Sequence, residues 1–185
     1  MKGKEALKII EQRLKEGHPK SEIFSELTGK VKFRTDLLQL LAMVPEEELR
    51  KKYRNLNVLL FTLIVLVATV KIVIAFFTLL SVSIYMVPFV IFIALVSAFF
   101  AYMVWNFRGN MYRILGLFGI AGLLKSISNF ETWGSYTATD WTLELLLVYI
   151  PGILIVILSY YIGIKVFPYY GFWGLLQEDK LNISA

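Results

Sequence analysis

The stretch NVLLFTLIVLVATVKIVIAFFTLL, from Asn57 to Leu80, contains 24 residues and a single charged side chain, Lys71. A helix needs about 20 predominantly apolar residues to cross the hydrocarbon core of a bilayer. The stretch therefore predicts a membrane-spanning helix. It also separates a charged N-terminal third of the chain from a remainder that is almost wholly hydrophobic.

The composition of the whole chain also favours a membrane protein. Hydrophobic residues make up 57% of the 185 residues and the mean hydropathy is +0.65, whereas soluble domains are about 45–50% apolar. The net charge is +5, and residues 1–56 hold 13 of the 19 Lys and Arg. A basic segment beside a membrane span is typical of a cytoplasmic flank that anionic lipid attracts. We therefore expect membrane lipids, and not nucleic acid, as partners.

The residue types that most often carry metal or thiol chemistry are scarce. Cysteine is absent and His18 is the one histidine, so disulfides and thiolate sites are excluded. We expect no cofactor and no zinc, copper or haem site. Chemistry within a span would need an activated nucleophile or paired acids, and no Asp lies in any predicted span. We therefore expect a non-enzymatic protein.

Residues 1–56 predict a cytoplasmic region of about three short helices, because apolar residues recur there at helical spacing between turn residues. The first helix is expected over residues 2–16. Ser21 is expected to cap the second helix and Gly29 to end it. The third helix is expected from about Thr35.

A fourth helix is predicted to begin at Pro45. Proline suits the first position of a helix, and the three acids at positions 46–48 suit the positive end of the helix dipole. No helix breaker lies between these residues and Asn57. We therefore expect one continuous helix from Pro45 through the first membrane span.

The segment Gly17 to Leu38 weakly resembles a helix-turn-helix DNA-binding motif. Gly17, Glu22-Ile23 and Leu27 stand at the spacings of such motifs, and Thr35 would begin a recognition helix near three basic residues, Lys30, Lys32 and Arg34. Phe24 departs from the motif, which usually has a small residue where its helices cross. The alternative, which we favour, is that these helices pack as a small bundle against the membrane or the fourth helix.

The fold class predicted from the sequence is an all-α membrane protein, a four-transmembrane-helix bundle preceded by a small cytoplasmic helical region. The bundle is expected over residues 57–168, with spans at about 57–80, 84–105, 111–128 and 142–167. Each length is close to the ~17–25 residues that a bilayer requires. Pro88 and Pro151 lie inside two of the spans and are expected to kink them. Residues 169–185 form a short cytoplasmic tail.

Positive charges in the short connections predict the orientation. Arg108 and Arg113 lie near the junction of the second and third spans, and Lys165 and Lys180 lie towards the end of the chain. The connections at 81–83 and 129–141 contain no positive charge. We therefore expect both termini on the cytoplasmic side of the cell membrane. We also expect the first span to act as an uncleaved anchor.

Each predicted span carries a stripe of small residues. Helices associate within a bilayer where Gly, Ala, Ser or Thr let their backbones approach closely. We therefore expect these residues to mark the packing faces. They are Ala68, Ala75, Ala94, Ala98, Gly116, Gly119, Gly122, Gly152, Ser159 and Gly163.

Ionisable side chains are predicted to gather at the outer side of the bundle. Lys71 shares the small-residue stripe of the first span, and Lys125 lies near the outer end of the third. Glu144 begins the fourth span, and Glu131 and Asp140 lie in the loop before it. A charged residue at the centre of a span costs about 2.5–3.5 kcal/mol on insertion scales.

Two interpretations of this outer Lys/Glu cluster remain open. The first is structural: ion pairs that fix helix register, or lysines that extend to the headgroups. The second is a polar cavity, reached by water, that binds or passes an anionic or polar solute or a lipid headgroup.

Three functions are compatible with these observations. The leading hypothesis is a multi-pass membrane protein that works by assembly, either with itself as a homo-oligomer or with a partner membrane protein. The second is a small oligomeric transporter or channel subunit that uses the outer Lys/Glu cluster. The third is a membrane-tethered DNA-binding regulator that uses residues 17–38.

Overall fold

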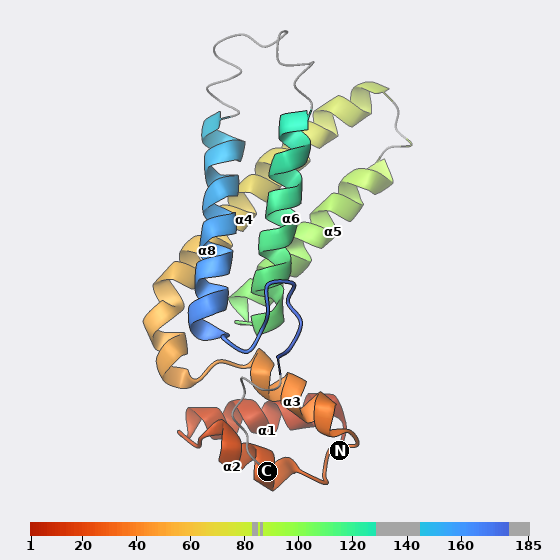
Figure 1. Cartoon of the computed structure of the whole chain (residues 1–185). Helices are drawn as coiled ribbons and strands as arrows, with labels where there is room; N and C mark the ends of the chain where they lie inside the picture. The colour runs from red at the N-terminus through yellow and green to blue at the C-terminus, as the bar shows by residue number, and fades with distance from the viewer. Residues whose placement is uncertain (83–84, 86, 129–144, 178–185) are drawn as a thin grey trace.

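The structure, a computed structural model, describes residues 1–82, 85, 87–128 and 145–177, and this part of the chain is helical without a β-strand (Figure 1). Helices α1, α2 and α3 gather at one end of a bundle made by α4, α5, α6 and α8 (Figure 1). The helices are α1 (Gly3–Lys15), α2 (Lys20–Leu27), α3 (Arg34–Met43), α4 (Glu47–Val82), α5 (Val87–Trp105), α6 (Gly109–Ser128), the π-helical turn η3 (Leu145–Tyr149) and α8 (Ile150–Val166).

Three helical segments of the described chain are long and apolar enough to cross a membrane. They are Glu47–Phe77 within α4, Val87–Trp105, and Leu145–Val166. The fourth predicted span, at 111–128, falls on α6, which has 20 residues and packs side by side with α8 (Figure 1). Helix α6 contains Arg113 and Lys125, and it is not one of the three segments long and apolar enough to cross a membrane.

Helix α4 forms one element of 36 residues that begins beside α3 and continues through the bundle. It begins at Glu47, so the predicted start at Pro45 is wrong. A residue before proline favours extended backbone, and Val44 has φ −101° and ψ 127°, which ends α3. The helix then starts two residues later, and the Glu46 carbonyl accepts the Arg50 N–H at 2.9 Å.

The predicted cap of the second helix is also wrong. Helix α2 begins at Lys20, and Pro19 occupies the capping position with φ −69° and ψ 152°. The Pro19 carbonyl accepts the N–H groups of Glu22 and Ile23 at 3.1 and 3.2 Å. Ser21 therefore lies inside the first turn.

The two prolines of the predicted spans stand near helix starts. Pro88 is the second residue of α5, where a missing N–H removes no intrahelical bond, so the predicted kink at Pro88 is not required. Pro151 is the second residue of α8, and α8 directly follows η3. A wider turn before a proline relieves the contact between its ring and the carbonyl four residues earlier.

A buried hydrogen-bond network joins α4, α5 and α6. The Asn57 amide donates to the Val104 carbonyl at 2.9 Å, and the Tyr112 hydroxyl donates to Asn57 Oδ1 at 2.5 Å. Val104 lies in the last turn of α5, where helix carbonyls lack helical partners. The Tyr112 ring stacks on Phe167, just after α8, with ring centroids 5.4 Å apart. Asn57 therefore joins α4 directly to α5 and α6. Through the stacking of Tyr112 on Phe167 it also connects these helices to the end of α8.

The N-terminal helices contact the bundle through charged, aromatic and apolar residues. Glu11 of α1 pairs with Arg108 at 3.1 Å, and the Lys20 ammonium lies 4.6 Å from the centre of the Tyr169 ring. Burial lowers the pKa of Lys20 to about 8, although the Glu46 carboxylate opposes this change. Leu176 packs against the core of the N-terminal helices and against the core of the bundle.

We predict that Asn57→Leu lowers the free energy of unfolding by about 1–3 kcal/mol, because it leaves the Tyr112 hydroxyl and the Val104 carbonyl without their buried partner. The matched control is Asn55→Leu, at an exposed position two residues earlier on α4. This variant should change the free energy of unfolding by less than about 0.5 kcal/mol. Thermal or denaturant unfolding of the detergent-solubilised protein provides the measurement. Equal destabilisation by both variants would contradict the role assigned to Asn57.

Candidate functional site

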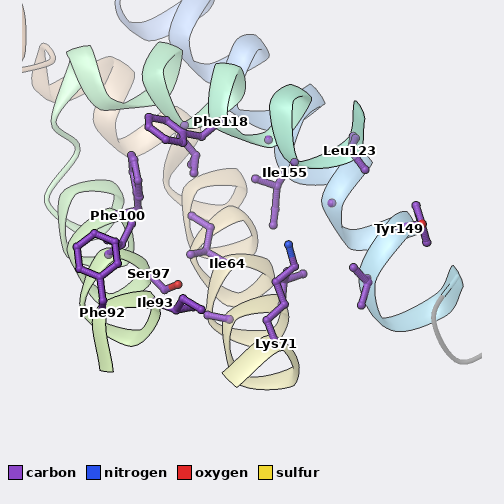
Figure 2. Close-up of a pocket in the computed structure, with 18 residues that line it drawn as sticks. Ile64, Lys71, Phe92, Ile93, Ser97, Phe100, Phe118, Leu123, Tyr149 and Ile155 are labelled. Carbon is purple, nitrogen blue, oxygen red and sulfur yellow. The ribbon is translucent and has the colours of Figure 1, made fainter. Parts of the chain in front are cut away.

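A cavity of about 350 Å³ lies between α4, α5, α6 and the segment formed by η3 and α8 (Figure 2). Ligand sites in proteins typically occupy about 300–1,000 Å³. The lining side chains are mostly apolar. They include Ile64, Val67, Phe92, Phe100, Phe118, Leu123 and Ile155, with Lys71, Ser97 and Tyr149 as the polar contributors.

Lys71 is the one charged residue among the described lining residues. Figure 2 shows its nitrogen pointing into the cavity, towards Ile155. Ile64, Ala68 and Lys71 are separated by four and three positions, so they share one face of α4. The unbroken course of α4 therefore places Lys71, an exposed residue, at the cavity on the same face as apolar lining residues.

Two glycines of α6 let that helix approach α8. A Cβ at Gly116 would lie 2.6 Å from the Tyr160 ring, and one at Gly119 would lie 2.6 Å from Val156 Cγ2. Distances this short cannot be accommodated without movement of one helix or its side chains. Gly116 and Gly119 therefore determine how closely α6 and α8 pack.

Gly122 has a different role on the same helix. A Cβ built there meets no heavy atom within 4 Å, and Gly122 lines the cavity. The face of α6 at Gly122 is therefore open, although the next residue, Leu123, lies against Gly152 of α8. The missing side chain at Gly122 contributes open space to the site.

The small residues of the C-terminal span also lie at different places. Gly152 lines the cavity, and Gly163 lies against Tyr112 and Arg113, where a Cβ would be 3.4 Å from the nearest atoms. Ser159 is buried, and its hydroxyl donates to the Ile155 carbonyl at 2.5 Å.

The four predicted alanines are less enclosed. Ala68 lines the cavity, whereas Ala75 and Ala94 are half-buried. Ala98 is exposed on α5. The small residues in close contact are therefore Gly116 and Gly119 of α6 and Ser159 and Gly163 of α8, while those of α4 and α5 remain partly open.

The structure describes two members of the predicted charged cluster, and of these Lys71 lines the cavity. Lys125 lies near the end of α6 with its side chain exposed, and it is not among the cavity-lining residues. Glu131, Asp140 and Glu144 lie outside the described residues.

The aromatic wall of the cavity had no signal in the sequence. Phe92, Val96 and Phe100 recur every fourth residue on α5, so they form one face that lines the cavity. However, nearly every other residue of α5 is apolar too, and Phe92 and Val96 are exposed like Phe89, Leu95 and Phe99 outside the cavity. A uniformly apolar helix gives no indication of which face turns inward.

The arrangement suits a molecule with an apolar body and one negative group. Apolar walls favour the body, and the Lys71 ammonium offers a charge-assisted hydrogen bond to a carboxylate or phosphate oxygen. No family model matches the chain, and no curated protein or solved structure is similar to it. The function must therefore be inferred from the chemistry of the cavity.

We predict that Gly119→Ala destabilises the bundle by about 1–3 kcal/mol, because its Cβ would overlap Val156 on the adjacent helix. Gly122→Ala is the matched control, and it should be neutral or stabilising since its Cβ meets open space. Unfolding of both variants in the same detergent gives the comparison. The assignment is wrong if Gly122→Ala is the more destabilising change.

Proposed function

We propose that this protein is a non-enzymatic, multi-pass membrane protein that binds an amphiphilic anion, an acyl chain with a carboxylate or phosphate group, within its helical bundle. The observation that supports the proposal is the position of the Lys71 ammonium in an otherwise apolar cavity. An isolated charge in apolar surroundings is costly unless it is paired. A bound anion would supply that pair, and its chain would occupy the apolar space.

The proposal includes four crossings with both termini in the cytoplasm. Helix α6 is antiparallel to α8 in the bundle and is long enough to accompany it across the apolar layer. Arg108 and Arg113 lie at the end of α6 that faces the basic N-terminal helices, which agrees with the preference for positive charge on the cytoplasmic side. In this orientation the cavity belongs to the outer half of the membrane.

The packing of the bundle favours binding over conduction. Between the cavity and the N-terminal helices, the bundle is filled by Leu60, Val104, Tyr112 and Phe167, none of which is more than 1% exposed. These residues close the inner end of the cavity. A transporter or channel would need a path across the membrane past Lys71. We therefore favour binding over the transporter or channel hypothesis.

The lining residues also favour a non-enzymatic role. Within the described part of the chain, no carboxylate or imidazole lines the cavity. Lys71 and Ser97 would therefore have no general base beside them among these residues.

We do not propose DNA binding through residues 17–38. Leu37, Leu38 and Leu41 of α3 pack in the core of the N-terminal helices, while Ala42 packs in the bundle core. A recognition helix needs a free face to enter the major groove. These contacts favour the packing alternative.

We predict that Lys71→Met weakens binding of a fluorescent long-chain fatty acid by about 10- to 100-fold, because it removes a charge-assisted hydrogen bond. Binding of the corresponding fatty alcohol should be unchanged, since the alcohol carries no charge. Gly122→Leu should reduce binding of both probes by filling the cavity. Fluorescence titration of the protein in a neutral detergent measures all three effects.

Lys125→Met is the control for charge, because Lys125 lies on the bundle but not in the cavity. It should leave fatty-acid affinity within about twofold of the unmodified protein. Unchanged binding in Lys71→Met, or an equal loss in Lys125→Met, would reject the proposed site.

Assembly remains a second proposed function, and the exposed surface of α5 supports it. Ala98 is exposed, with the large side chains of Phe99 and Leu95 exposed beside it. A small residue on a face not used within the chain is suited to contact with another membrane helix. The partner would be a second copy or another membrane protein.

We predict that Ala98→Leu lowers the fraction of oligomer, because the larger side chain would hold two α5 helices apart. Ala121→Leu is the matched control on α6, where the alanine is also exposed, and it should leave the fraction unchanged. Crosslinking in lipid bilayers, followed by gel electrophoresis, measures the fraction of oligomer for each variant. A monomer for the unmodified protein at every protein-to-lipid ratio would end the assembly hypothesis.

A further inference from the structure

A second cavity, of about 390 Å³, lies where α1, α4 and the end of α5 meet. Four of its lining residues are cationic: Lys15 from α1, and Arg50, Lys51 and Arg54 from α4. Glu47 is the one acidic residue among the lining residues that the structure describes. This basic groove is at the opposite end of the bundle from the Lys71 cavity.

The charges of the basic groove are only partly balanced. Glu47 lies 3.9 Å from the Lys51 ammonium, one turn along α4. Within the described part of the chain, Lys15, Arg50 and Arg54 form no ion pair. Three cations directed at one space repel one another, and an anion bound between them would be attracted by all three.

The basic groove continues into an apolar surface. Arg50, Arg54 and Val58 follow one another at intervals of four residues, so they lie along one face of α4. That face changes from charged to apolar over about 12 Å. Trp105 borders it with 56% of its surface exposed and its ring 5.0 Å from that of Phe61. Tryptophan at such a boundary is typical of the membrane interface.

We propose that the basic groove binds the headgroup phosphate of an anionic phospholipid. The phosphate would lie between Lys15, Arg50 and Arg54, and the acyl chains would follow Val58 and Trp105 towards the membrane interior. A soluble anion would use the cations alone, whereas a phospholipid uses the cations and the adjoining apolar face. A lipid is therefore the ligand that matches the whole groove.

The position of Lys15 connects this site to the docking of the N-terminal helices. Glu11, one turn earlier on α1, pairs with Arg108 at 3.1 Å. A phospholipid held by Lys15 and Arg54 would add a second link between α1 and the bundle. The headgroup would thus bind at the junction of the two parts of the fold, at a site whose lining residues are separate from those of the Lys71 cavity.

The experiment compares phosphatidylglycerol with phosphatidylcholine on the full-length protein in a neutral detergent. Lipid adducts are counted by native mass spectrometry during titration, and inorganic phosphate is tested as a competitor. The unmodified protein should bind phosphatidylglycerol more tightly than phosphatidylcholine. Arg54→Gln and Lys15→Gln should each weaken phosphatidylglycerol binding about fivefold, since each removes one basic contact.

Lys52→Gln is the matched control, because Lys52 is on the same helix but does not line the groove. It should leave the affinity within about twofold, and Arg54→Lys should retain most of the binding because it keeps the charge. An equal loss in Lys52→Gln would overturn the proposal, as would equal affinity for the two lipids. Displacement by inorganic phosphate without any preference for phosphatidylglycerol would identify a free-phosphate site and reject the lipid.

Discussion

The hydrogen bonds that Asn57 makes with Tyr112 and Val104 are the interaction on which the bundle depends. An unpaired amide at that depth would be costly, so the three helices that supply these groups have to meet there. The ring of Tyr112 then brings Phe167, and with it the end of α8, to the same point. The bundle is consequently anchored at one end, where polar groups select a single arrangement. Towards the other end it is held together by apolar and small residues.

This difference between the two ends explains why the molecule has two cavities of opposite character. The tightly packed residues around Asn57 separate them. On one side, a mostly apolar space lies beside Gly122 and is lined by the single charged residue Lys71. On the other side, the basic start of α4 meets α1, and a charged groove forms. Both spaces are suited to amphiphiles, but they differ in the ratio of charged to apolar surface, and therefore in which molecule they would prefer.

Much of the fold could be predicted from the sequence, because long apolar stretches and helix breakers act locally. The continuous course of α4 and the three short N-terminal helices are examples. Lys71 lines the cavity together with the small residue Ala68 of the same helix face, and its orientation towards the bundle and away from lipid stays a prediction. The role of Asn57 could not be predicted, because its partner Tyr112 lies 55 positions away and neither residue has a distinctive pattern around it. Similarly, the uniformly apolar α5 conceals which of its faces lines the cavity.

The length of α4 has a mechanical consequence. A helix of 36 residues extends for about 54 Å, and Arg54 and Lys71 are separated by about 25 Å along its axis. Both cavities are therefore lined by one continuous helix, which the hydrogen bonds of Asn57 hold at a point between them. A tilt of α4 about this point would move the lining residues of both cavities. Occupancy of either cavity would then alter the affinity of the other by the same factor, as thermodynamic linkage requires.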